Sequence, residues 1–137
     1  MSYYFEIKGT FYGKNVFPDL NNYISECARS PHCGGRLKRD YMLIASNAIR
    51  RQLPKVEIEK PVFIKYKIYE ATAKRDFSNV GSFATKVIED SLQQCKVLKN
   101  DNQKCVRGYS HEFFIDRVNP RIEVEIIEIE NEEIMYI

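Results

Sequence analysis

The fold is decided by residues 60–95, which read KPVFIKYKIYEATAKRDFSNVGSFATKVIEDSLQQC. From Lys60 to Ala71, apolar residues alternate with lysines and aromatic residues, which predicts a strand with one buried face. The inward set is Val62, Ile64, Tyr66 and Ile68, and Lys65 and Lys67 point outward together. From Val80 to Cys95 the apolar residues recur every three or four positions, which predicts an amphipathic helix. Asp76 lies at the junction of the two elements, a common place for ligand sites in α/β sheets.

The remaining segments extend this unit to a β-α-β-α-β-β order. Strands are predicted over residues 3–8, 105–115 and 121–129, and a helix is predicted over residues 37–53, where Pro54 ends it. Residues 10–39 are rich in Asn, Pro and Gly and are predicted to be a long irregular segment of the kind that binds something. We therefore expect an α/β (α+β) fold in a single domain over residues 1–137, with two helices packed on a mixed sheet.

Charge is unevenly distributed along the chain. Residues 1–107 hold 19 Lys and Arg against 11 Asp and Glu, a net charge of +8, whereas residues 108–137 hold 2 against 8, a net charge of −6. The basic part suits a polyanion, although ordinary solvated faces would give the same counts. No apolar run approaches the roughly 20 residues of a membrane span. The first residues lack a signal-peptide pattern, and four scattered cysteines do not form a secreted disulfide framework, so we expect a cytoplasmic protein.

Basic side chains gather in three places of the sequence, and they have two possible roles that the sequence does not separate. They serve solubility, or they contact DNA phosphates, which is a salt-sensitive and sequence-independent interaction. The candidates for DNA contact are Arg29, Arg36, Lys38 and Arg39 in the irregular segment, Lys65 and Lys67 in the strand, and Lys74 and Arg75 before the helix.

A zinc site in the irregular segment is weakly supported. Cys27, His32 and Cys33 lie close together, but zinc needs four ligands, commonly with a Cys-x₂₋₄-Cys pair, and no second pair lies nearby.

Two aspartates are the candidates for a magnesium site. Mg²⁺ takes oxygen ligands, often one or two carboxylates together with a substrate phosphate, so Asp76 and Asp101 would suffice if they meet. The chemistry would be phosphodiester hydrolysis, with Lys86 or Lys74 offsetting phosphate charge. Asp90 is excluded from direct ligation because it lies 14 residues past Asp76, or about 15–20 Å along the helix.

Each of these residues also has a purely structural interpretation. Asp76 or Ser78 would serve as a helix N-cap, because both residue types accept backbone N–H bonds. Asn100-Asp101-Asn102 is ordinary turn chemistry. Lys86 and Asp90 form an i,i+4 pair on a helix surface.

The ordered set of motifs resembles the RusA family of Holliday-junction resolving endonucleases, including phage and prophage members. The residues that carry the resemblance are Arg75-Asp76-x-x-Asn79, Lys86-x₃-Asp90-x-Leu92 and Asn100-Asp101, with Leu20-Asn21-x-Tyr23-Ile24 before them and Ser110-His111-Glu112-Phe113-Phe114-x-Asp116 and Asn119-Pro120-Arg121-Ile122-Glu123-Val124-Glu125-Ile126 after them. The resemblance covers nearly the whole chain.

The resemblance implies a homodimeric, Mg²⁺-dependent endonuclease, with Mn²⁺ as a possible substitute, that nicks four-way DNA junctions symmetrically. It implies that Asp76 and Asp101 hold the metal and that Asn79 and Asp90 support the site. Lys86 matches the family's helix lysine when counted from Asp90. The chain departs from the family at Ser78, where a second Asp is usual, so Ser78 would be a weaker oxygen ligand.

Three hypotheses follow. The first is an active junction-resolving nuclease. The second is a homologue that binds branched DNA without cleaving it, because Ser78 replaces a carboxylate. The third is a structural phage protein with no DNA role, which a lack of salt-dependent junction affinity would favour.

Overall fold

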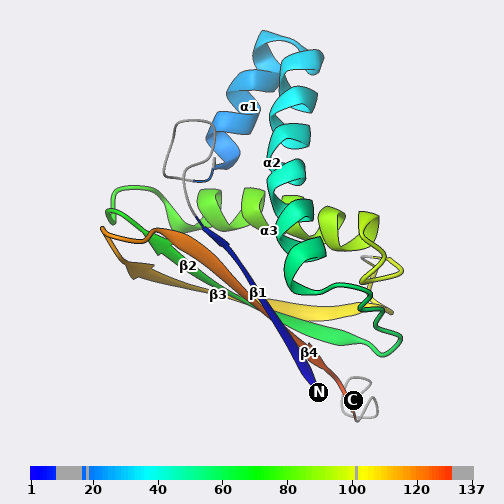
Figure 1. Cartoon of the computed structure of the whole chain (residues 1–137). Helices are drawn as coiled ribbons and strands as arrows, with labels where there is room; N and C mark the ends of the chain where they lie inside the picture. The colour runs from blue at the N-terminus through cyan, green and yellow to red at the C-terminus, as the bar shows by residue number, and fades with distance from the viewer. Residues whose placement is uncertain (9–16, 18, 101, 131–137) are drawn as a thin grey trace.

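A computed structural model of the chain shows a four-stranded mixed sheet with three helices (Figure 1). The structure describes residues 1–8, 17, 19–100 and 102–130. The elements in chain order are β1 (Ser2–Lys8), α1 (Leu20–Arg29), α2 (Pro31–Gln52), β2 (Val62–Glu70), α3 (Phe77–Gln94), β3 (Val106–Ile115) and β4 (Arg121–Glu128). This α+β arrangement confirms the predicted fold class, and all four predicted strands are present.

The strands lie in the order β1-β4-β2-β3. β2 and β3 are parallel and are joined through α3, whereas β4 runs antiparallel to both β1 and β2. α3 and the second half of α2 lie over one face of the sheet, while α1 and the start of α2 extend away from it (Figure 1). Because β2 and β3 are parallel, their carboxyl ends meet at one edge of the sheet, next to the start of α3.

The core lies between the sheet and the helices. The inward residues of β2 are buried as predicted, and Lys65 and Lys67 are exposed on the opposite face. The apolar stripe of α3 packs with α2 over the inward residues of β1 and β4, and the fully buried side chains include Phe5, Ile7, Ile49, Ile64, Val87, Ile88, Leu92, Val124 and Ile126. This packing fixes where α3 begins relative to the ends of β2 and β3.

The prediction of an irregular segment over residues 10–39 is wrong from residue 20 onward, because the chain forms a third helix, α1, which packs against α2 and α3 and extends away from the sheet. α1 is started by a capping box in which the Asp19 side chain accepts from the Asn22 backbone N–H and the Asn22 side chain accepts from the Asp19 N–H, both at 2.9 Å. α2 begins six residues earlier than predicted, with Ser30 as N-cap and Pro31 in its first turn. Residues 10–16 and 18 of the predicted irregular segment lie outside the described residues.

The start of α2 was not predicted because two glycines, which disfavour helices, lie in its first turns. Gly34 and Gly35 lie inside the helix, where glycine costs about 1 kcal/mol relative to alanine. A Cβ on Gly34 would collide with the Cys27 side chain of α1, so this glycine allows the two helices to approach closely. The tertiary contact therefore outweighs the low helix propensity.

Gly81 plays a similar part between α3 and β3. The Thr85 Oγ1 and His111 Nε2 atoms are hydrogen-bonded at 2.6 Å, and the His111 ring packs 5.3 Å from that of Tyr66. Burial lowers the pKa of His111, which favours the neutral form of the ring. A Cβ on Gly81 would lie 2.6 Å from His111 Nδ1.

We therefore expect Gly81→Ala to destabilise the protein. The substitution gains about 1 kcal/mol of helix propensity, but overpacking costs about 1–3 kcal/mol. In a His111→Ala background the collision is absent, so the same substitution should stabilise by about 1 kcal/mol. Urea unfolding of the four proteins measures both values, and a stabilising Gly81→Ala in the parent chain would contradict the close approach.

Candidate functional site at the carboxyl ends of β2 and β3

A cleft of about 640 Å³ opens where β2 and β3 end and α3 begins. Its lining comes from three successive parts of the fold: Glu70, Thr72, Ala73, Arg75, Asp76, Phe77, Phe113, Phe114 and Ile115. Phe77 and Ile115 are more than half exposed, so one wall of the cleft is apolar and open. The cleft occupies the edge of a parallel strand pair at which ligands commonly bind.

Asp76 is the N-cap of α3 and lines this cleft. Its Oδ1 accepts a hydrogen bond from the Ser78 backbone N–H at 2.9 Å, so the structural interpretation of Asp76 as a cap is confirmed. The residue is exposed, as is Ser78, and Asn79 is half-buried in the same turn. A carboxylate at a helix N-terminus lies where backbone N–H groups also attract phosphate oxygens.

Glu70 is a second carboxylate in the cleft that the sequence analysis did not single out. Both of its oxygens accept from Arg75, at 3.0 Å from Nε and at 2.9 Å from Nη2. Asp19 lies 3.9 Å from the same guanidinium. Arg75 was predicted to contact DNA, but its charge is here shared with two carboxylates. The signal that could have found Glu70 is an acidic residue ending a strand six positions before Asp76.

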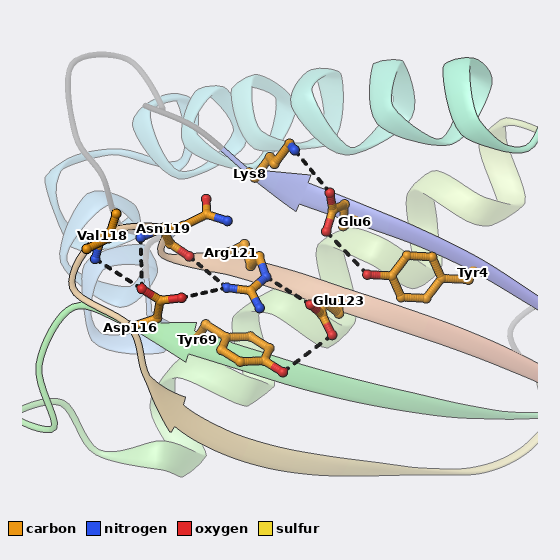
Figure 2. Close-up of polar contacts among 9 residues, drawn as sticks. All are labelled: Tyr4, Glu6, Lys8, Tyr69, Asp116, Val118, Asn119, Arg121 and Glu123. Carbon is orange, nitrogen blue, oxygen red and sulfur yellow. Dashed lines mark hydrogen bonds and ion pairs between the residues drawn. The ribbon is translucent and has the colours of Figure 1, made fainter.

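The turn between β3 and β4 directly follows the end of β3 and is held by hydrogen bonds and ion pairs (Figure 2). The Asp116 backbone N–H donates to the Glu70 carbonyl at 2.8 Å, and its side chain accepts from Arg121 Nη1 at 2.9 Å. The Arg121 guanidinium lies over the Tyr69 ring, 3.7 Å from its centroid, and its Nε donates to Glu123 at 2.8 Å. Hydrogen bonds to Asn119 and Arg121 hold the pKa of Asp116 below its ordinary value. The turn is therefore fixed by its own charges.

Lys86 and Asp90 do not lie beside Asp76 within one chain. Lys86 is ten residues further along α3, or about 15 Å. Its Nζ lies 3.3 Å from Asp90 Oδ1, and Lys38 of α2 lies 2.7 Å from Asp90 Oδ2. Asp90 therefore forms one ion pair within α3, which confirms the predicted i,i+4 pair, and a second ion pair that ties α3 to α2.

Asp101 lies outside the described residues, so its pairing with Asp76 stays a prediction. Its neighbours Asn100 and Asn102 follow the C-terminal end of α3, and the Asn102 carbonyl accepts from the Val106 N–H at 2.9 Å. α3 has 18 residues and spans about 27 Å, so these neighbours lie at the opposite end of the helix from Asp76.

The basic residues predicted to contact DNA lie in three places: on α1 and α2, on the open face of the sheet, and just before α3. Arg29, Arg36 and Arg39 are exposed on α1 and α2, and Arg29 forms an ion pair with Glu26. Lys65 and Lys67 lie on the open face of the sheet, where Glu125 and Glu123 of β4 are their cross-strand neighbours. Lys74 is exposed two residues before Asp76.

The donor set fits magnesium better than a softer metal. The cleft offers carboxylate and hydroxyl oxygens, which are the ligands of hard cations. Among the described residues there is no group of three or more His, Cys, Asp and Glu that could hold a metal ion. Both oxygens of Glu70 already accept hydrogen bonds from Arg75. Among the described residues of the cleft, Asp76 is therefore the carboxylate best placed to bind a metal ion.

Neither a scan against protein-family models nor a search of curated proteins found a match to this sequence. None of the helices in the described part of the chain is long and apolar enough to cross a membrane.

Proposed function

We propose that this protein is a Mg²⁺-dependent endonuclease that resolves four-way DNA junctions. The observation that carries the proposal is the position of Asp76. This exposed carboxylate lies at a helix N-terminus, on an open cleft at the carboxyl ends of two parallel strands. Such a position suits a metal ion and a phosphate together, because the carboxylate attracts the cation and the helix terminus attracts the anion.

The roles of the residues follow from this position. Asp76 and Ser78 would hold the metal, which when bound supplies charge neutralisation and an activated water. Lys74, exposed on the approach to α3, would contact the scissile phosphate or its neighbour. Mn²⁺ shares the preference for oxygen ligands and would substitute. Arg75 keeps Glu70 in place and balances its charge at the back of the cleft.

A second copy of the chain would complete the site. Asn100 and Asn102, which flank the second carboxylate Asp101 in the sequence, lie at the far end of α3 from Asp76, so we infer that the two carboxylates of one site come from two chains. A four-way junction presents two equivalent strands, and a two-fold homodimer presents two equivalent sites. In such a dimer the Asn100–Asn102 turn of one copy can serve the Asp76 cleft of the other.

An alternative function is binding of branched DNA without cleavage. The observation that favours it is the capping bond of Asp76, which explains this residue without any metal. The hydroxyl of Ser78 is also a poor substitute for a carboxylate around a hard cation. The exposed arginines of α1 and α2 would serve binding equally well in either case.

The test is nicking of a synthetic four-way junction by the purified chain. With Mg²⁺ or Mn²⁺ we expect paired nicks at symmetric positions, no cleavage in chelator, and little cleavage of a linear duplex of the same sequence. Salt-dependent junction binding without nicking in either metal, together with nicking by Ser78→Asp, would establish the alternative. Absence of any salt-dependent junction affinity would contradict both functions.

A further inference from the structure

The face of the sheet opposite the helices carries an ordered row of side chains at the carboxyl ends of β2 and β3. The strand register places Tyr69 of β2 between Arg121 of β4 and Phe114 of β3. The Arg121 guanidinium lies over the Tyr69 ring, 3.7 Å from its centroid. The Phe114 and Tyr69 rings are stacked, with centroids 4.9 Å apart and planes 21° from parallel. Because β4 and β3 lie on opposite sides of β2, the three groups form one continuous stack.

The inner end of this stack is held by charged neighbours. Arg121 donates to Asp116 Oδ2 from Nη1 at 2.9 Å and to Glu123 Oε2 from Nε at 2.8 Å (Figure 2). The Tyr69 hydroxyl donates to the other oxygen of Glu123 at 3.4 Å, which orients the ring. A surface that is fixed before its ligand arrives loses little conformational entropy on binding. The stack is therefore prepared to receive a further flat group at its outer end.

The outer side of Phe114 is the open end of the stack. β3 is the edge strand of the described sheet, so no described strand lies beyond it, and the Phe114 side chain is 39% exposed. Phe77, the other exposed ring at the cleft, packs edge-on against Phe113 at 67° and takes no part in a parallel stack. Phe114 therefore offers a flat apolar surface on which one more planar ring can stack.

We propose that Phe114 stacks on an unpaired base of DNA whose phosphate lies in the Asp76 cleft. Phe114 also lines that cleft, so the same residue borders the position of the base and the position of the phosphate. A nucleotide joins a flat base to a phosphate through one sugar, and every base has a face that stacks on an aromatic side chain. The inference rests on the proposed function for the position of the phosphate, whereas the stack is formed by the described residues alone.

Charge on this face of the sheet restricts the site to a single base. The row of the stack holds two cations, Lys8 and Arg121, and no acid. The next row away from the cleft holds three carboxylates around one lysine: Glu6, Glu123 and Glu112. A phosphate backbone is therefore attracted to the ends of the strands and repelled from the middle of the sheet. The substrate class that fits is branched DNA with a single-stranded arm, from which one base turns onto Phe114.

Photocrosslinking tests this contact, because it reports stacking and not cleavage. On irradiation, 5-iodouracil crosslinks to an aromatic side chain on which it is stacked. The probes are DNA duplexes with a 5′ or a 3′ single-stranded arm that carries 5-iodouracil next to the branch. They are bound by the purified chain in Ca²⁺, which shares the oxygen ligands of Mg²⁺. We expect peptide mass spectrometry to locate the crosslink at Phe114.

Three variants make the assignment specific. Phe114→Leu keeps an apolar side chain but removes the ring, so it should lose the crosslink and weaken binding of the single-stranded arm about 5- to 100-fold. Phe114→Tyr keeps the ring and should keep both. Tyr4→Leu removes another exposed ring of the same sheet face, on β1, and should change neither. Circular dichroism checks the fold of each variant, and the crosslink position in the parent chain decides the matter if Phe114→Leu does not fold.

The possible outcomes separate the stacking site from the proposed function. No crosslink, a crosslink at Phe77 or elsewhere, or a folded Phe114→Leu variant that binds the arm as tightly as the parent would overturn the stacking site. A crosslink at Phe114 in a chain that nicks no four-way junction would support the stacking site and contradict the proposed function. Junction nicking by a chain that shows no crosslink at Phe114 would do the reverse.

Discussion

Asp76→Asn is expected to lower metal-dependent junction cleavage at least about 100-fold and to leave the fold intact. A metal ligand matters at least as much as its hydrogen-bonding partners, whose loss typically costs 10–100-fold. Asparagine is as good an N-cap as aspartate, so the Ser78 N–H keeps its acceptor and α3 keeps its start. The change therefore removes a negative charge at the site and little else. Single-turnover nicking and thermal unfolding are the two measurements.

Two further variants separate the role of Asp76 as a metal ligand from its role as the N-cap of α3. Asp76→Ala removes both, so it should lose cleavage and also about 0.5–2 kcal/mol of stability. Glu57→Gln removes an exposed carboxylate near the opposite end of the sheet and should change neither quantity. Junction binding should persist in Asp76→Asn, since the change removes negative charge near the phosphates. Full cleavage by Asp76→Asn would show that this carboxylate holds no metal.

The strands and α3 were predictable from the sequence because their burial is one-sided. β2 alternates between inward apolar residues and outward lysines or aromatic residues, and α3 carries a buried stripe from Val80 to Leu92. Each pattern has a single period, which only one kind of secondary structure satisfies. The ends of these elements differ from the prediction by a few residues, because caps such as Asp76 lie outside the stripe.

α1 and the start of α2 could not be predicted from the same kind of pattern. They project from the sheet, so they pack mainly against each other and touch the core at only a few places, such as Tyr23 against Phe83 (Figure 1). Their signals are local and unusual. Asn22 closes the capping box in place of Glu or Gln, and Gly34 sits where the helices touch. These features are recognisable only once the neighbouring helix is in place.

The site was only partly predictable for a related reason. Asp76 stood out because it joins a predicted strand to a predicted helix, and the structure places it on the cleft. Glu70 was missed because it ends β2: alternation places it on the inward side after Ile68, but a charged residue at that point ordinarily marks only the end of the buried run. The neighbours of Asp101 lie about 27 Å away because the helix between them is 18 residues long, and sequence order does not reveal whether a second chain bridges that length.

Mixing two inactive variants is expected to restore cleavage. Asp76→Asn and Asp101→Asn should each be inactive alone, since every composite site then lacks one carboxylate. In a heterodimer of the two, one site takes Asp76 from one chain and Asp101 from the other, and is intact. Random pairing makes half of the dimers mixed, each with one working site, so nicking should recover to about a quarter of the parent level. These dimers should nick one strand of each junction, not two.

The reciprocal mixture supplies the control. When the parent chain is mixed in equal amounts with the double variant Asp76→Asn/Asp101→Asn, every site in the mixed dimers lacks one carboxylate. Nicking should therefore fall to about a quarter, whereas sites built within single chains would leave about half. Subunits must exchange before the assay, which brief unfolding and refolding of the mixture achieves. If the first mixture stays inactive and the second keeps half of its activity, both carboxylates act from the same chain. The 18-residue length of α3 would then have to be bridged by a rearrangement of the described fold.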